Sequence, residues 1–290
     1  MSTFVTAALD VGGTKIAAAL VTPDGTVLHR DERPTVTAGR LRDPGLAGTR
    51  AAAVDLLAQA RRLGLTVTGL GAGFPEYVAA DGLLTSREVL AWDKQPLDVL
   101  SALALDVPCA VGSDVRCGAL GEARHGAGRG LDGFFYVSLG TGLSSTFVLD
   151  GMPVTGARGE AIALGEFEVP ASVDPNWPGN LESYASGRGI GERFGVAGTR
   201  EVLAAGGPRA AAVLDSAGRA LGTVLAAVVR LLDPAAIVVG GGLGSAAGPV
   251  RAAMERAYAE HTAARPAAPP LLTATLGADA GLVGAAALAG

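Results

Sequence analysis

Apolar residues along the chain fall into short runs whose spacing alternates between that of strands and that of helices. The runs at 4–11 and 15–36 predict three successive strands, because a Pro-Asp-Gly turn at 23–25 divides the second run. Leucine and alanine at helical spacing then predict a helix over 46–64 that ends at a glycine. The sheet therefore begins as a meander followed by a helix.

The opening pattern returns later in the chain. Residues 134–151 again read as a strand, a glycine turn and a strand, as residues 4–21 do, and this repeat predicts two related α/β domains facing each other. We expect a smaller domain over 1–125, joined by the C-terminal helix at about 281–290, and a larger domain over 126–280. The other predicted elements are a strand at 66–78, helices at 96–105 and 115–128, a short strand at 108–114, a loop at 168–189, two alanine-rich helices, a strand at 235–244, another helix, and a closing strand and helix at 271–290.

Composition excludes several classes of protein. The 290 residues suffice for two domains with separate cores. Apolar residues make up 49% of the chain, but alanine inflates this share and charged residues interrupt the long runs, so no membrane span is expected. The first residues lack the basic start of a signal peptide, which predicts a cytoplasmic protein. The net charge of −5 predicts no general binding to nucleic acid or membranes, and Cys109 and Cys117 lack the spacing of a zinc site.

The first glycine turn carries the residue types of a phosphate site. Gly12 and Gly13 let backbone N–H groups approach an anion, and Thr14 adds a hydroxyl donor. Asp10, at the end of the preceding strand, is suited to hold a hydrated magnesium ion beside the phosphates, and Lys15 adds positive charge. For one such turn alone, a plain hairpin is the simpler explanation.

A second turn and a third glycine run change that balance. Gly140, Thr141 and Gly142 repeat the strand-to-strand context, so two donor-rich turns are placed to hold one polyphosphate. A third run follows a buried strand and precedes a helix, which predicts a flat surface for adenine and ribose. It consists of Gly240, Gly241 and Gly242. The fingerprints of a dinucleotide fold and of a P-loop are not found in the sequence.

Taken in chain order, these motifs resemble the ROK (repressor, open reading frame, kinase) family of sugar kinases, within the superfamily of actin, hexokinase and the heat-shock-protein ATPases. The resemblance covers nearly the whole chain, through the segments 10–15 (DVGGTK), 73–82, 113–126, 137–145, 164–168, 181–189, 232–244 and 276–286. It implies two ribonuclease-H-like domains with a cleft between them. It also implies transfer of phosphate from ATP, with Mg²⁺, to a primary hydroxyl of a sugar-like small molecule, and it leaves a homodimer open.

The resemblance assigns roles to single residues. Asp114 stands at the position of the family's catalytic aspartate and is expected to act as general base. Its place before a helix offers an N-cap as the alternative role. Glu166 and Glu182 match glutamates that bind sugar hydroxyls, a task that suits the paired oxygens of a carboxylate.

Departures from the family pattern carry further expectations. Ser113 occupies a substrate-binding position where the family has asparagine, so an amide partner for the sugar is lost. Glu168 and Val169 replace the usual glycine and histidine, and the sequence DPNWPGN at 174–180 replaces a cysteine cluster. We therefore expect no zinc, with Trp177 packing that loop in place of the metal.

Glu76 stands where the family has glycine, in a loop expected to face the sugar ring. One hypothesis pairs its carboxylate with an amino group of an acceptor such as kanosamine; the alternative is a surface glutamate. Whether Glu168 contacts substrate stays open, as do a seven-carbon cyclitol of the valiolone type and plain glucose as acceptors. A catalytically silent sugar-binding protein is the non-enzyme alternative. A DNA-binding repressor is not expected, because the first turn begins at Asp10 and leaves no room for a helix-turn-helix.

Overall fold

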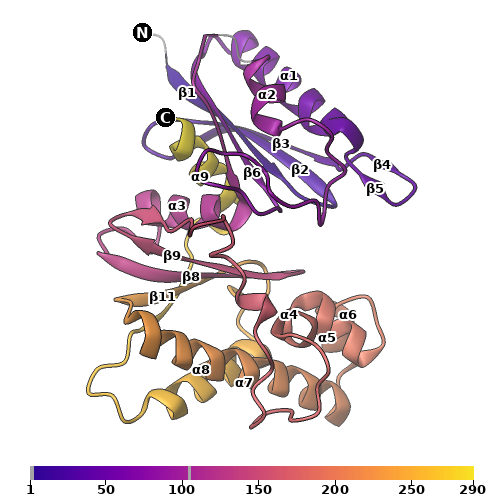
Figure 1. The fold of residues 1–290 in the computed structure, drawn as a ribbon, viewed down its shortest axis with the longest axis vertical. Helices are drawn as coiled ribbons and strands as arrows, with labels where there is room; N and C mark the ends of the chain where they lie inside the picture. The colour runs from indigo at the N-terminus through magenta and orange to yellow at the C-terminus, as the bar shows by residue number, and fades with distance from the viewer. Residues whose placement is uncertain (1–2, 104–105) are drawn as a thin grey trace. The chain divides into compact units, whose positions relative to one another are not determined.

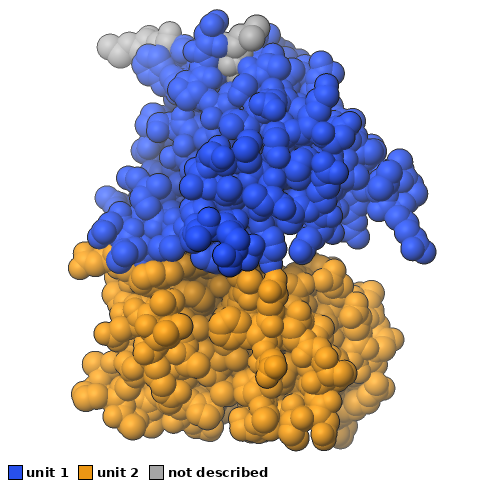
Figure 2. Space-filling model, viewed as in Figure 1, with its two compact units in different colours: residues 1–130, 148–162, 278–290 blue, residues 131–147, 163–277 orange. Residues whose placement is uncertain are grey.

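The computed structural model describes residues 3–103 and 106–290. Two compact units make up this α/β protein (Figure 2). Unit 1 contains residues 1–130, 148–162 and 278–290, and unit 2 contains residues 131–147 and 163–277.

The sheet of unit 1 has the spatial order β3-β2-β1-β6-β7. β2 pairs antiparallel with β1 and β3, whereas β1, β6 and β7 run parallel. Their bounds are β1 Phe4–Val11, β2 Lys15–Val21, β3 Val27–Pro34, β6 Thr66–Phe74 and β7 Cys109–Ser113, and a separate small pair comprises β4 Thr37–Ala38 and β5 Leu41–Arg42. The central strands are continuous apolar runs because helices cover both faces of the sheet.

Helix α1 covers one face of this sheet, and α3 and α9 pack together on the other face (Figure 1). The helices are η1 Pro44–Leu46, α1 Ala47–Arg62, α2 Pro96–Ser101, α3 Asp114–His125, η3 Gly277–Asp279 and α9 Ala280–Ala289. α9 approaches β6 closely at Gly71, where any added Cβ would collide with the carbonyl of Ala285. The helix predicted over 96–105 is present as α2 to Ser101, and residues 104–105 lie outside the described residues.

The second sheet has the order β10-β9-β8-β11-β12. Its strands are β8 Gly133–Leu139, β9 Leu143–Leu149, β10 Met152–Pro153, β11 Ala236–Gly240 and β12 Leu271–Thr273. The helices of unit 2 are η2 Leu164–Glu166, α4 Leu181–Ala185, α5 Gly187–Phe194, α6 Thr199–Ala205, α7 Gly207–Leu232 and α8 Pro249–Thr262. α7 is long and apolar enough to cross a membrane by length and composition alone, but 61% of its most apolar window is buried inside the protein, as expected of a core helix.

The two sheets share one topology. Numbered by their appearance within each sheet, the strands lie in the order 3-2-1-4-5 in both. β11 runs parallel to β8 and β12, as β6 runs parallel to β1 and β7. The predicted internal repeat is therefore confirmed, and the carboxyl ends of the parallel strands gather at one edge of each sheet.

The units differ from the predicted domains by a few residues at 126–130 and 278–280 and by one whole segment, and unit 1, which corresponds to the domain expected to be smaller, is the larger of the two. Residues 278–290 lie in unit 1, where the sequence had placed the C-terminal helix. Residues 148–162 also lie in unit 1, although the sequence had assigned them to the larger domain. The reason is local, since β10 in this segment packs against α3.

Candidate active site

Two aspartates lie at the carboxyl edge of the unit 1 sheet. Asp10 is next to last in β1 and pairs across with Gly73 of β6, which in turn pairs with Gly112 of β7. Asp114 begins α3 directly after β7. Gly73 permits the close approach of the second aspartate, because an added Cβ there would lie 3.3 Å from the Cα of Asp114. Parallel strands thus bring together two residues that are far apart in the sequence.

The surroundings of Asp114 favour its protonated form. Burial raises the pKa of Asp114 to about 7, and the negative charges of Asp10 and Glu76 act in the same direction. The backbone N–H of Val115 donates to its Oδ1 at 2.6 Å and opposes the rise. A carboxyl group with such a pKa can both accept and release a proton near neutral pH.

Asp10 is suited to hold a cation through water. Burial raises the pKa of Asp10, while the charges of Lys15 and Arg30 lower it. Within the described part of the chain, no residue donates a hydrogen bond to this carboxylate. A single carboxylate with unused oxygens beside a phosphate turn fits a magnesium ion that keeps most of its waters.

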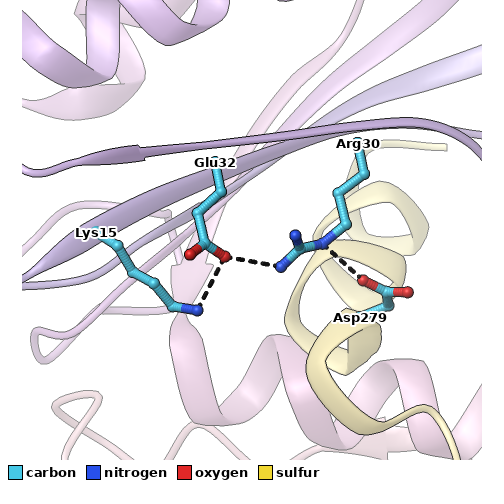
Figure 3. A network of polar contacts seen from close by, with 4 residues as sticks. All are labelled: Lys15, Arg30, Glu32 and Asp279. Carbon is cyan, nitrogen blue, oxygen red and sulfur yellow. Dashed lines mark hydrogen bonds and ion pairs between the residues drawn. The ribbon is translucent and has the colours of Figure 1, made fainter.

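Lys15 belongs to a chain of four charged side chains (Figure 3). Its ammonium contacts Glu32 Oε2 at 2.9 Å, the same oxygen that accepts from Arg30 Nη2 at 2.9 Å, and Arg30 Nε reaches Asp279 Oδ1 at 3.0 Å. The Lys15 side chain is 56% exposed. Its charge is therefore shared with Glu32, which weakens the support it can give to a phosphate in the turn.

The first glycine turn is braced by the end of β3. Gly12 N donates to Lys15 O at 2.8 Å, and Thr35 ties both sides of the turn through its N–H to Thr14 O and its hydroxyl to Gly12 O. Arg42 Nη1 donates to Gly13 O at 3.3 Å. The carbonyl groups of the turn are thus held in place by Thr35 and Arg42.

Glu76 departs from its predicted surroundings. It is only 3% exposed, and its carboxylate accepts four hydrogen bonds from the loop that follows. Oε2 accepts from Ser86 Oγ and Glu88 N, and Oε1 accepts from Val89 N and Leu90 N. The expected pairing with a substrate amino group has no support in this geometry, because both carboxylate oxygens of Glu76 accept hydrogen bonds from the loop that follows it.

Ser113 also differs from its expected role. Its side chain is fully buried, and its Oγ accepts a hydrogen bond of 2.9 Å from Arg116 Nε. A hydroxyl without exposed surface cannot form a direct hydrogen bond with a bound sugar. The serine therefore supports the start of α3 rather than a substrate-binding surface.

The glycine loops of unit 2 border a cavity of about 540 Å³. The predicted Gly140, Thr141 and Gly242 line it, whereas Gly142, Gly240 and Gly241 do not. Gly241 has φ +79°, a conformation that glycine adopts without strain, and it lets Leu243 N and Gly244 N both donate to Leu139 O. Its role is to bend the chain so that Gly242 reaches the cavity.

Sequence reasoning missed most of this cavity's wall, since it named only three of the thirteen lining residues. The other lining residues come from the start of α5, from the loop before α6, from α6 itself and from the segment after β11: Gly187, Arg188, Ala197, Gly198, Thr199, Arg200, Glu201, Leu203, Leu243 and Ala246. Gly187 N donates to Gly140 O at 2.8 Å, and Arg188 N donates to Thr141 O at 3.1 Å. The signal was present in the Ser-Gly-Arg-Gly sequence at 186–189, where Ser186 caps a helix that opens with glycine.

The two predicted sugar-binding glutamates lie near each other in unit 2. The carboxylate of Glu182 lies beside Gly142 and Gly165, whose added Cβ atoms would come within 3.6 and 3.1 Å of its oxygens. Glu166 follows Gly165 and is exposed. Arg188 Nη2 contacts Glu182 Oε1 at 2.8 Å, so one oxygen of Glu182 is engaged and links this carboxylate to the cavity wall.

Aromatic packing holds the loop expected to replace a metal site. The rings of Trp177 and Tyr184 meet edge to face at 5.1 Å, and the Arg193 guanidinium lies 3.5 Å from the centre of Tyr184. Val169 belongs to the core of unit 2, while Glu168 is exposed and forms a β-bridge with Asn180. Within 3–103 and 106–290, no three His, Cys, Asp or Glu side chains gather as metal ligands.

Comparisons with known proteins agree with this arrangement. A model of the ROK family matches residues 6–290. The chain is 34% identical to the bifunctional enzyme NanE/NanK of Brucella melitensis, over 97% of this chain but about half (53%) of that enzyme. It is 30% identical to a glucokinase of Streptomyces coelicolor, covering 98% of this chain and 97% of the relative. It is 26% identical to a kanosamine kinase of Amycolatopsis mediterranei, covering 97% and 95%.

Solved structures show the same likeness. A ROK hexokinase from Thermus thermophilus superposes with a TM-score of 0.82 at 30% identity, covering 98% of this chain and 97% of the other. A ROK family glucokinase from Streptomyces griseus, in complex with glucose and AMPPNP, superposes with a TM-score of 0.81 at 28% identity, covering 98% and 99%. The α/β units are therefore those of the actin-like ATPase fold.

Proposed function

Because the chain belongs to the ROK family, we propose that it is an ATP-dependent kinase that phosphorylates the primary hydroxyl of a hexose or hexose-like acceptor. The observation that carries the proposal is Asp114, whose pKa of about 7 suits a general base. Relatives named as glucokinase and kanosamine kinase, each matched along nearly its whole length, support the same reaction class.

For this reaction the protein must mainly position the acceptor and ATP and accept the hydroxyl proton. The acceptor oxygen attacks the γ-phosphorus of ATP, the bond from that phosphorus to the ADP oxygen breaks, and the hydroxyl proton passes to Asp114. Thr141 and Gly242 border the cavity that receives the nucleotide, and Glu166 and Glu182 bind acceptor hydroxyls. Asp10 would hold magnesium, and the ion would offset the charge of the phosphates.

A neutral hexose is the acceptor that the unit 1 geometry favours. Glu76 is the residue that was expected to bind an ammonium group of the acceptor, but its carboxylate already accepts four hydrogen bonds from its own loop. The hydroxyl-binding glutamates of unit 2 suit a polyhydroxylated ring with or without an amino group. An amino sugar such as kanosamine and a seven-carbon cyclitol are therefore second choices.

An acceptor screen tests the proposal. The purified protein is incubated with ATP and Mg²⁺ and with glucose, mannose, N-acetylmannosamine, kanosamine or valiolone, and ADP release is followed alongside the mass of the product. We expect sugar-dependent ADP release with a monophosphorylated product, highest for a neutral hexose. A silent sugar-binding protein would release no ADP above background with any acceptor.

A further inference from the structure

Unit 1 contains a second cavity, of about 190 Å³, that none of the predicted site residues lines. Its wall comes from the loop after β6, from β7, α3 and α9, and from residues 152–155. The wall is mostly apolar, with Val111, Leu120 and Leu288 among its side chains. One guanidinium, that of Arg116, supplies a full charge to this apolar space.

Arg116 is more than nine-tenths buried, with 8% of its surface exposed. Its hydrogen bonds all go to neutral oxygens: Nε donates to Ser113 Oγ at 2.9 Å, and Nη2 donates to Val78 O and to Gly159 O. In the described part of the chain, no carboxylate lies within ion-pair distance of it. Burial accordingly lowers the pKa of Arg116, and the neighbouring Cys117 opposes this only in part.

Two N–H groups of this guanidinium remain unused. A guanidinium has five N–H donors, of which Nε uses one and Nη2 uses two. Nη1 donates to no residue among those described, yet no fully enclosed side-chain nitrogen in this part of the chain lacks a partner. Nη1 is therefore not fully enclosed, and the open space that Arg116 is known to line is this cavity.

We propose that this cavity is a binding site for a small monocarboxylate, held by Nη1 of Arg116. The carboxylate would supply the counter-charge that the chain does not, through charge-assisted hydrogen bonds. The volume equals that of about six water molecules, which suits an acid of three to five carbons. A phosphate fits less well, because it calls for more donors than one guanidinium nitrogen and the hydroxyl of Thr155 provide.

The proposed carboxylate site is separate from the site of the proposed kinase reaction. Arg116 follows Asp114 by two residues, but its side chain points to Ser113, Val78 and Gly159. Carboxylate binding in this cavity therefore does not depend on which acceptor is phosphorylated, and it does not require kinase activity.

Thermal unfolding of the intact protein with sodium propionate tests the site, with sodium chloride at equal ionic strength as the reference. We expect a saturable rise in Tm of about 2–4 °C at ten times the Kd. The rise should vanish in Arg116→Met and persist in Arg50→Met, which removes an exposed arginine of α1. Ala80→Phe, which fills the cavity from an exposed position and leaves Arg116 in place, should also abolish it.

Calorimetric titration of propionate into the wild type and Ala80→Phe keeps the test decisive if Arg116→Met does not fold. Saturable binding to the wild type alone supports the site. Equal binding to both proteins, a Tm rise that chloride reproduces, or the absence of saturable binding overturns it. Stronger Arg116-dependent binding of inorganic phosphate than of propionate overturns the assignment to a carboxylate.

Discussion

Gly281, in the first turn of α9, lies directly against the carboxylate of Asp10. An added Cβ at this glycine would come within 2.8 Å of Asp10 Oδ2. The C-terminal helix therefore has no room for a side chain where it passes the residue assigned to magnesium. This contact links the last element of the chain to the first strand.

Replacing Gly281 with alanine is expected to displace the Asp10 carboxylate. A misplacement of about 1 Å at a reacting centre can cost on the order of 10²-fold in rate, so we expect kcat to fall about 10- to 100-fold and the Mg²⁺ concentration for half-maximal activity to rise. Steady-state kinetics over a range of Mg²⁺ measures both. Gly248→Ala is the matched control, because no atom lies within 4 Å of the added Cβ; equal behaviour of the two variants would contradict the account.

Glu76→Gln should destabilise unit 1 and should not change acceptor preference. The amide turns one acceptor oxygen into a donor that faces two donors, which costs about 1–3 kcal/mol of unfolding free energy. Urea unfolding measures this loss, with the exposed Glu88→Gln as control. If the variant instead lost kcat/KM for amino sugars alone, this would show that Glu76 pairs with an ammonium group of the substrate.

Much of this architecture follows from patterns in the sequence, and the exceptions have identifiable causes. The strand and turn repeat at 4–21 and 134–151 predicts both sheets, because alternating runs and glycine turns are local signals. Burial of Glu76 and Ser113 was not predictable from the apolar pattern, since it depends on how the loop to Leu90 folds back over Glu76 and on the Arg116 side chain, which covers Ser113.

The site shows the same division. Asp10 lies near the carboxyl end of β1 and Asp114 follows the carboxyl end of β7, with only the parallel strand β6 between them, so their proximity follows from topology. The wall formed by residues 197–203 belongs to a loop and a short helix with no periodic signal, and only the fold brings it to Gly140. The same holds for 148–162, whose place in unit 1 rests on the contact of β10 with α3.

Trp177→Ala should loosen the loop that precedes α4. Loss of the contacts with Tyr184 and Arg193 is expected to lower the free energy of unfolding by about 2–3 kcal/mol. Phe167→Ala, which removes a ring that is 49% exposed, should cost about 0.5 kcal/mol or less. A zinc chelator should leave the wild-type Tm unchanged; one zinc per chain by elemental analysis would contradict the replacement of metal by aromatic packing.

Asp114 should lower stability at high pH. Its folded pKa is raised from 3.8 to about 7, so between these values the folded chain keeps a proton that the unfolded chain has released, and stability falls as the pH rises. Asp114→Asn should therefore have a higher Tm than wild type at pH 8, with a gap that narrows toward pH 5. Differential scanning calorimetry measures the gap, and the exposed Asp132→Asn should show none. A gap that widens on acidification would contradict the raised pKa.

The central claim is that Asp114 is the general base of a sugar kinase, and the pH dependence of kcat/KM for the best hexose tests it most directly. Wild type should lose activity about tenfold per pH unit below about pH 7, as the base becomes protonated. Asp114→Asn should lower kcat about 10²-fold or more and bind a non-hydrolysable ATP analogue as tightly as wild type. An Asp114→Asn variant with near-normal kcat, or a wild-type profile flat between pH 5 and 8, would contradict the account.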